Sequence, residues 1–517
     1  MIYDLEETGH QSVTADVLVI GGGTVGLVVA SGLADRGRSV VVVESGGMEQ
    51  MGDTHPLNEV LQTRADYAGA ALGRFRCLGG TSTRWGGALI PFTRADGRAA
   101  EWPIEIDGVL DYVPKVEALF GLSAGPYAAA GVLRGPGLDF CARAAKWPSF
   151  KNRNVATILA DKLRGSQKLK VWINATATDF QVMRSCLSTV TARSVSGGEL
   201  RVIATEVVIA AGAIETTRLL LLLDQQNGHA LFEPDGQLGR FFSDHLSIPV
   251  ADVQPSDRDA LNVRVGFRFE GRGGAMRNVR FELTDGTPLR NAVPPCFAHI
   301  AFDDAGATGF VALRETYRYL QRRGLPSARV LSRLAISAPW LTKALWWRFA
   351  RGRLLYPREA KIQLHMVIEQ APQRDNQIQL SSARVDIFGK PLAEIAWDVA
   401  SEDVENLKRA TQAFLDTWSA SDLESIARLV PYPTDDYARA LERGGGIYHP
   451  VGSARMANSP DRGVVDANLR PFRLQNVSVV STAVLPRSGG CNPTMMLLCL
   501  GMRNVDHIDG LLGAKGE

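Results

Sequence analysis

Residues 16–26 read Asp-Val-Leu-Val-Ile-Gly-Gly-Gly-Thr-Val-Gly, and this stretch decides the fold. Its first five residues, apolar from Val17 onwards, predict a buried strand, and the glycines after them predict a tight turn. An amphipathic pattern then continues to about Arg36, and residues 39–44 form a second apolar run. A buried strand, a glycine turn, a helix and a second buried strand make one unit of a parallel sheet.

The glycines of this turn satisfy the pattern G-x-G-x-x-G. Gly21 permits the tight turn, Gly23 lets the backbone approach a pyrophosphate, and Gly26 lets helix and strand pack closely. Glu44 ends the second strand about twenty residues further on, where a carboxylate can accept hydrogen bonds from ribose hydroxyls. The unit predicts a dinucleotide site, argues against a 2′-phosphate and does not separate FAD from NAD. The alternative is an ordinary glycine turn, with Glu44 as a solvated strand end.

Composition excludes several classes of protein. The chain has 517 residues, 45% of them hydrophobic, and a formal net charge of +2, which suggests neither nucleic acid nor an acidic partner. Its six cysteines lack C-x-x-C spacing, so we expect no metal site and a reducing, cytoplasmic location. Residues 1–15 do not have the pattern of a secretory signal, and no run reaches the ~18 apolar residues of a membrane span.

Ordered motifs in the rest of the chain resemble the glucose-methanol-choline (GMC) oxidoreductases. The C-terminal ones are Tyr448–Ser453 (Tyr-His-Pro-Val-Gly-Ser), Gly463–Asp466, Asn476–Val480, Leu485-Pro486 and Gly490–Thr494 (Gly-Cys-Asn-Pro-Thr). Earlier ones are Gly79–Ser82 with Trp85–Gly87, Ala211–Glu215, Gly239–His245 and Glu369–Pro372. The resemblance runs from about residue 15 to residue 508 and is weakest over 255–357. Glu101–Ile104 and the Thr-Arg-Trp-Gly-Gly run look like the pyranose-oxidising branch and its bacterial sugar dehydrogenase relatives.

The resemblance implies an α/β protein in which a Rossmann-type FAD-binding domain is interleaved with a sheet-based α+β substrate domain. The absence of a linker or an internal repeat agrees with interleaving. We expect the FAD-binding domain to comprise residues 10–110, 151–250 and 440–517. The substrate domain would then comprise residues 111–150 and 251–439.

The resemblance also implies FAD as the cofactor and places residues around it. Gly80, Thr81 and Ser82 would lie along the pyrophosphate and ribityl chain, and the strand around Ala177 would pass the adenine. Arg84 stands where some relatives carry a histidine that links the flavin covalently, so we expect dissociable FAD. The full set expected at the cofactor is Gly21, Gly23, Thr24, Val25, Gly26, Glu44, Gly80, Thr81, Ser82, Trp85, Gly87, Ala88, Ala177, Ala211, Gly212, Ser481, Thr482, Asn492, Pro493 and Thr494. Ser481 and Thr482 depart from an Asp-containing pair common in the family.

His449 and Asn492 are the expected catalytic residues. Alcohol oxidation removes a hydroxyl proton and a hydride from the same carbon, and histidine titrates near working pH, which suits it to take the proton. The amide of Asn492 can bond the substrate oxygen without competing for the proton. The alternative for His449 is a structural histidine in a loop. We expect His245 to be structural, His365 to be either packed or in the substrate cavity, and Glu215 to cap a helix.

The expected activity is FAD-dependent oxidation of an alcohol, on a sugar, glycoside or similar polyol, with oxygen, a quinone or a redox protein as electron acceptor. The alternatives are a lyase or decarboxylase on the same fold and a cofactor-free scaffold. Residues 329–357 form a basic, aromatic stretch that contains Trp340, Trp346, Trp347 and Phe349. This stretch could contact a membrane surface, form a lid, bind another subunit or pack inside.

Overall fold

The larger sheet is parallel at its centre, around the two long strands β2 (His10–Ile20) and β9 (Glu199–Ile209). The structure, a computed structural model, describes residues 1–514 apart from 51, 100–101, 234–235, 272, 304–307, 322–324 and 445. The strand order is β1 (Ile2–Asp4), β6 (Leu169–Ile173), β3 (Val40–Val43), β2, β9, β8 (Cys186–Arg193) and β7 (Thr176–Met183), with β18 (Val477–Val479) paired to β9.

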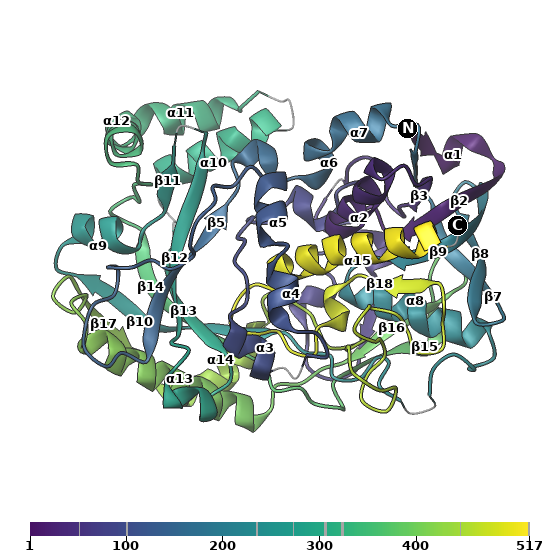
Figure 1. Cartoon of the computed structure of the whole chain (residues 1–517). Coiled ribbons are helices and arrows are strands. Elements are labelled where there is room, and N and C mark those ends of the chain that lie inside the picture. Colours follow the sequence, from purple (N-terminus) through teal and green to yellow (C-terminus); the bar gives the residue numbers. More distant parts are fainter. Residues whose placement is uncertain are drawn as a thin grey trace.

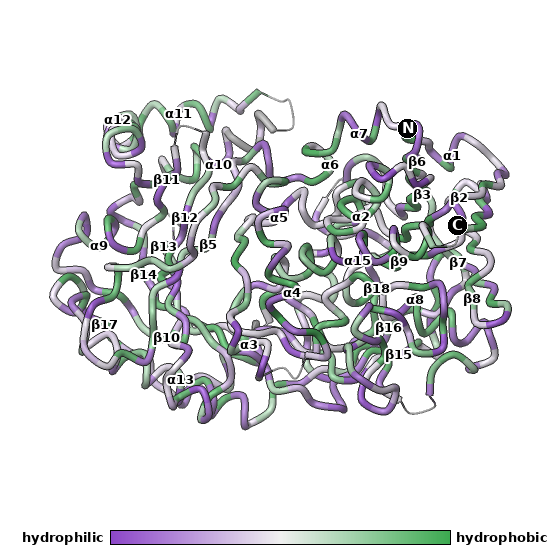
Figure 2. The backbone as a smooth tube through the Cα atoms, viewed as in Figure 1, coloured by the Kyte–Doolittle hydropathy of each residue, from purple (hydrophilic) through white to green (hydrophobic). Residues whose placement is uncertain are grey.

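Helices cover this sheet, which explains its continuous apolar strands. All four residues of β3 are buried, as are the last four of β2. Helices α2 (Thr24–Asp35) and α15 (Thr494–Ala514) pack against each other, and α8 (Ala213–Gln226) packs beside β7. Hydrophobic residues gather where α2, β3 and β9 meet (Figure 2). Strands buried on both faces need apolar side chains at every position, so the Rossmann-type prediction is confirmed.

The second sheet is antiparallel and lies at the other side of the molecule (Figure 1). Its order is β11 (Arg268–Glu270), β12 (Ala275–Leu283), β13 (Cys296–Asp303), β14 (Lys361–Glu369), β10 (His245–Pro255) and β17 (Ala427–Pro431), with β5 (Phe140–Trp147) paired to β12. One face packs on α13 (Ser401–Ser419) through alternate residues such as Leu364 and Met366. The expected domain boundary at residue 250 falls inside β10, which joins this sheet from His245 onwards.

A small third sheet joins β15 (Gln377–Val385), β16 (Pro391–Ala396) and β4 (Val60–Gln62). The remaining helices are α1 (Leu5–Thr8), α3 (Arg94–Ala99), α4 (Ile106–Leu110), α5 (Val113–Leu119), α6 (Val155–Ile158), α7 (Ala160–Gly165), α9 (Arg258–Val265), α10 (Thr308–Gln321), α11 (Ala328–Ile336), α12 (Ala338–Trp346) and α14 (Tyr437–Gly444). Within the part of the chain that the structure describes, no helix is both long and apolar enough to cross a bilayer.

Candidate active site

Two glycine loops far apart in sequence meet at the carboxyl end of β2. The amide of Gly79 donates to the carbonyl of Gly22 at 2.8 Å. A Cβ on Gly80 would lie 2.8 Å from the Cα of Gly23, whereas a Cβ on Gly23 itself would meet no atom within 4 Å. The space in front of Gly23 therefore faces the N-terminus of α2, whose first-turn amides have no acceptor within the helix. An open space beside such a helix end suits a pyrophosphate.

Gly21 and Gly26 allow close packing of the protein backbone and are not open to a ligand. Gly21 has a φ of +108°, and a Cβ there would lie 2.6 Å from the carbonyl oxygen of Ala210. A Cβ on Gly26 would lie 2.0 Å from the carbonyl oxygen of Gly21. The three glycines thus have the separate roles that the spacing predicts, and only the Gly23 position opens toward a ligand.

Glu44 is buried and already holds two backbone amides. Its two carboxylate oxygens accept from Gly22 at 2.7 Å and from Gly46 at 2.9 Å. Burial raises the pKa of this carboxyl, and the two amide hydrogen bonds oppose that rise. Each oxygen keeps a second lone pair for a ribose hydroxyl. The interpretation of Glu44 as a solvated strand end is therefore wrong.

The other segments expected at the cofactor converge on the same edge of the sheet. The backbone of Ala175 donates to the Glu44 carbonyl at 2.8 Å, which brings the start of β7 and Ala177 beside the first unit. Val480 donates to Ile209 at 2.9 Å, so Ser481 and Thr482 follow the strand next to Ala211 and Gly212. Pro493 and Thr494 begin α15.

Several hydroxyl and indole groups in this set are held by the protein itself. The Ser82 hydroxyl donates to Gly79 at 2.6 Å, and the Thr482 hydroxyl donates to Pro450 at 2.7 Å. The Trp85 indole donates to the carbonyl of Arg153 at 2.9 Å. These side chains fix the shape of the loops, and backbone atoms remain the groups available to a cofactor there.

His449 lies at the end of a continuous hydrogen-bond chain. Its Nδ1 is 3.2 Å from Nδ1 of His245, and its Nε2 is 3.0 Å from the amide nitrogen of Asn492. Nε2 of His245 is 2.7 Å from the carbonyl oxygen of Gly489. At the far end, Arg280 donates to the amide oxygen of Asn492 at 2.7 Å.

The groups at the two ends of this hydrogen-bond chain determine which nitrogen atoms carry a proton. A carbonyl oxygen only accepts, so Nε2 of His245 carries a proton and Nδ1 of neutral His245 is an acceptor. Nδ1 of His449 must then donate to it, which leaves the Nε2 lone pair of His449 as a hydrogen-bond acceptor. The Arg280 guanidinium can only donate, so the amide of Asn492 must turn its oxygen toward Arg280. Its N–H group then points to Nε2 of His449. Nε2 of His449 is thus held as an unprotonated acceptor.

Burial keeps both imidazoles neutral. It lowers the pKa of His245 to about 4, and burial followed by the neighbouring His245 and Arg280 lowers the pKa of His449 well below its usual value. The carboxylate of Asp244 accepts from the backbone amides of His449 at 2.8 Å and of His245 at 2.6 Å, and from the Tyr67 hydroxyl at 2.7 Å. Burial raises the pKa of Asp244 to about 7 despite these hydrogen bonds.

Asp244, His245 and His449 also lie close enough to share a metal ion, with one ligand atom from each within 4.8 Å of the others. Their hydrogen bonds to one another, to Tyr67 and to Gly489 already satisfy these atoms. Hydrogen bonding alone therefore accounts for the geometry, and the expectation of no metal site stays a prediction.

A row of rings leads from His449 along the antiparallel sheet. The ring centroids of His245 and Phe297 are 6.4 Å apart, those of Phe297 and His299 5.8 Å, and those of His299 and His365 5.3 Å. His299 and His365 are half-buried, on the face opposite the α13 core. Burial, then His365 and Arg280, lowers the pKa of His299 to about 3. His365 is half-buried in this row, and both alternatives for it, a packed residue or a residue of the substrate cavity, stay predictions.

Glu215 does not cap α8, contrary to expectation. Its carboxylate pairs with Arg76 at 2.8 Å and with Arg218 at 2.9 Å. Burial would raise its pKa, but Arg76, Arg218 and Arg74 outweigh burial and lower the pKa to about 2. The motif residue therefore joins α8 to the loop before the second glycine turn.

Sequence reasoning missed Arg280, Asp244 and Tyr67, and placed His245 outside the site. Arg280 lies on β12, 212 residues before Asn492, and no local pattern marks it. The Phe-Ser-Asp-His run before β10 was the available signal for Asp244 and His245. It indicated a family segment without showing what that segment contacts.

Known proteins share this architecture. Residues 372–501 match the family model described as GMC oxidoreductase. The large subunit of fructose dehydrogenase from Gluconobacter japonicus is 25% identical over 309 residues, which cover 60% of this chain and 48% of that subunit. A 2-methyl-1,2-propanediol dehydrogenase from Mycolicibacterium austroafricanum is 24% identical over 307 residues, 58% of this chain and 47% of that enzyme. The match thus spans about half the length of these relatives.

Solved structures match over nearly their whole length. Pyridoxine 4-oxidase from Mesorbium loti has a TM-score of 0.61 and 17% identity, covering 95% of this chain and 98% of its own. A formate oxidase has a TM-score of 0.61 and 16% identity, covering 97% and 99%. A glycine cradle open at Gly23 and a carboxylate at Glu44 are the groups that an FAD pyrophosphate and ribose need. Residues 372–501 therefore carry the C-terminal domain of the GMC oxidoreductases, and the proteins that match the chain are members of that family, whose members are FAD-binding flavoproteins.

Proposed function

We propose that the protein oxidises an alcohol carbon of a small polar molecule, with His449 as the base. The observation that supports the proposal is the 3.0 Å hydrogen bond between the Asn492 amide nitrogen and the unprotonated Nε2 of His449, which puts a base and a hydrogen-bond donor side by side. A substrate hydroxyl placed at both groups would donate its proton to His449 and accept a hydrogen bond from Asn492. FAD, when bound, supplies the acceptor for the hydride.

The protein's own part in this reaction is to hold one imidazole in one tautomer. Removal of the hydroxyl proton builds negative charge on the substrate oxygen, and the Asn492 amide is oriented by Arg280 to meet that charge. The proton taken by His449 makes an imidazolium whose Nδ1–H still donates to His245. Asp244 holds the backbone of both histidines, so the base stays in register with the substrate.

Two half-buried histidines in the row of rings next to His245 support a hydroxylated substrate. His299 and His365 line the accessible face of the sheet, and Nδ1 of His299 is buried without a hydrogen-bond partner among the described residues. A buried polar atom of this kind gains from a ligand hydroxyl. Two relatives are named for fructose and for 2-methyl-1,2-propanediol. A sugar, glycoside or similar polyol is the substrate class we favour.

The proposal also includes an electron acceptor for the flavin and a cellular location for the protein. Oxygen, a quinone or a redox protein would reoxidise the flavin. All six cysteines carry free thiols, four of them buried, which agrees with a reducing, cytoplasmic environment.

The test is anaerobic reduction of the bound flavin. The purified protein should be yellow, and its colour should bleach with a member of a panel of sugars, glycosides and simple alcohols. Bleaching separates oxidation from lyase or decarboxylase chemistry on the same fold. A colourless protein that does not take up added FAD would refute the proposal.

The flavin should leave with the supernatant after acid precipitation. Arg84 takes the position of the linking histidine, and its guanidinium pairs with Asp53 at 3.0 Å and donates to the carbonyl of Gln50 at 2.7 Å. A guanidinium cannot form the histidyl bond. Yellow colour that persists in the washed pellet would contradict non-covalent binding.

His245 should act as a positioning residue. His245→Phe keeps a ring of similar size but removes the acceptor for Nδ1 of His449, so the proton of neutral His449 can move to Nε2. We expect flavin reduction to slow by roughly 10–100-fold, the range for residues that orient a functional imidazole. FAD content and substrate KM should change little.

The matched variant for this test is His245→Gln. Its amide can accept from His449 and donate to Gly489, so it should recover most of the rate. The two variants should also differ in the pH profile of flavin reduction, because only His245→Gln fixes the tautomer of His449. Equal rates in both variants would show that His245 is merely structural.

A further inference from the structure

Exposed apolar side chains gather on one part of the substrate domain. Of the nineteen large hydrophobic residues that are exposed in the described part of the chain, eight fall between residues 313 and 349. They occur on α10, α11, α12, the turn after α12 and, for Leu325, the segment just before α11, and these helices lie at the outer end of the molecule (Figure 1). We call six of them the apolar face: Leu325, Leu331, Ile336, Leu345, Trp346 and Phe349. Monomeric proteins seldom leave such a group uncovered.

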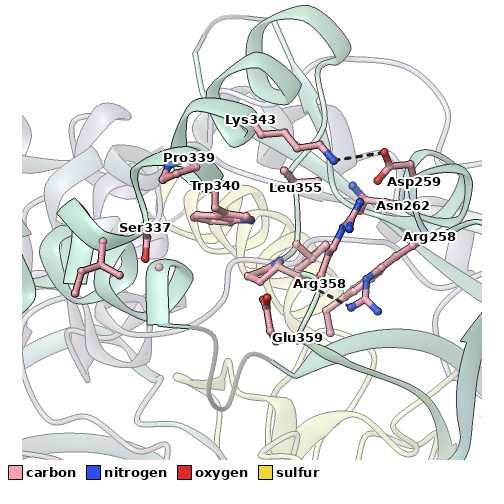
Figure 3. Close-up of a pocket in the computed structure, with 15 residues that line it drawn as sticks. Arg258, Asp259, Asn262, Ser337, Pro339, Trp340, Lys343, Leu355, Arg358 and Glu359 are labelled. Atoms are coloured by element: carbon pink, nitrogen blue, oxygen red, sulfur yellow. Dashed lines mark hydrogen bonds and ion pairs between the residues drawn. The ribbon is translucent and has the colours of Figure 1, made fainter.

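The inner sides of the same helices pack as an ordinary core. Val330 of α11 and Trp347 at the end of α12 are 4% and 1% exposed, whereas Ile336 and Phe349 are 78% and 75% exposed. Lys343 is 3.6 Å from Asp259 on α9, and Trp340 turns into a cavity of about 490 Å³ below α12 (Figure 3). Packing inside the protein thus explains the inner side of this segment only. It does not explain the exposed apolar side chains on the outer side.

This cavity is remote from the chemistry. Phe302 and Leu355 line it, and Phe302 pairs with Ile362 near the start of β14, whereas Glu369 at the end of β14 lies beside His245. Seven residues of strand separate the two ends, roughly 23 Å at strand spacing. The lining of this cavity therefore lies at the opposite end of β14 from the His245–His449 pair.

The charge of the segment contrasts with that of the rest of the protein. Residues 308–357 contain ten arginines and lysines and one acidic residue, a net charge of +9, while the whole chain carries +2. The remaining residues therefore carry −7. Arg329 is exposed beside Leu331, and Arg351 lies over the Trp346 ring at 5.0 Å. A symmetric dimer through this face would bring two such basic surfaces together, which disfavours a second copy as the occupant.

We propose that the apolar face docks on an anionic lipid surface. Helices that lie in a membrane interface carry Trp, Phe and Leu on one side and flanking Arg and Lys that attract acidic headgroups. The cytoplasmic leaflet is the anionic one. The apolar face enters the headgroup region through Ile336, Trp346 and Phe349, and the surrounding arginines bind the phosphates and carboxylates. This inference stands independently of the reaction proposed above.

Sedimentation with vesicles tests the proposal on the holoenzyme. The wild type should bind phosphatidylcholine vesicles that contain phosphatidylserine, and binding should weaken about tenfold or more without phosphatidylserine or at high salt. Ile336→Ser with Phe349→Ser should weaken binding about tenfold or more, because two apolar side chains no longer enter the interface. Trp347 is unsuitable for this test because its removal would damage the core.

A matched variant places the same change elsewhere. Val385 and Ile387 are 58% and 59% exposed on or beside β15, and Val385→Ser with Ile387→Ser should leave vesicle binding unchanged. FAD content should remain normal in both double variants. Wild type that fails to sediment, or that sediments equally with neutral vesicles, would overturn the proposal. Self-association lost in the Ile336/Phe349 variant, without vesicle binding, would assign the face to a second copy instead.

Discussion

His449→Ala should slow flavin reduction by ~10²–10⁴-fold or more, the usual contribution of a general base. The alanine removes the imidazole that we propose takes the hydroxyl proton, so a poorly reactive alcohol must donate the hydride. FAD content should stay near normal, because His449 bonds to His245 and Asn492 and to no residue of the glycine loops. Anaerobic stopped-flow reduction with the substrate found in the screen gives the rate, and its dependence on concentration separates chemistry from binding.

The wild type should keep its reduction rate to a lower pH than a free imidazole would allow. His449 works as a base only when neutral, and burial, with help from His245 and Arg280, lowers its pKa well below 6.5. The rate should therefore be constant above the lowered pKa and fall only below it. A low-pH limb near or above the ordinary histidine value would contradict a base that is kept neutral by a lowered pKa.

Asn492→Ala is the comparison for His449→Ala. Sequence reasoning gave Asn492 one role, to orient the substrate, and the structure adds a second, because its oxygen is the acceptor for buried Arg280. The variant should be slower than wild type but faster than His449→Ala, since the base remains. Wild-type reduction rates in His449→Ala would remove this residue from the mechanism.

The sequence predicted the parts of the site that lie in contiguous motifs. The first strand, glycine turn and helix follow from a buried parallel strand and from close backbone approach, both of which leave a local pattern. The positions of His449 and Asn492 came from motif order. The Rossmann-type fold was predicted correctly for the same reason.

What the sequence could not predict depends on contacts between distant strands. His245 contacts His449, which is 204 residues away in the sequence, and Arg280 reaches Asn492 from β12 of the antiparallel sheet. Glu215 looked like a helix cap because caps are local, whereas its arginine partner Arg76 lies 139 residues away. Trp346 and Trp347 are adjacent in sequence, yet one is exposed and the other buried, because a helix turns neighbours to different sides.

Gly23→Val should abolish FAD binding while the protein still folds. Gly23 has a φ of −79°, which any residue adopts, and an added Cβ meets no protein atom within 4 Å. The branched side chain would instead fill the space in front of the α2 N-terminus, where the pyrophosphate must approach the backbone. The purified variant should be colourless, and its circular dichroism should match that of the wild-type apoprotein.

Gly26→Val separates loss of cofactor from loss of fold. Its Cβ would lie 2.0 Å from the carbonyl oxygen of Gly21, so strand and helix could not keep their spacing. This variant should lose both FAD and thermal stability, whereas Gly23→Val should lose FAD and keep the apoprotein Tm. A folded Gly23→Val protein with a full complement of FAD would show that the cofactor does not lie against this glycine. Equal loss of Tm in both variants would mean that Gly23 is needed for packing, against the open space seen at its Cα.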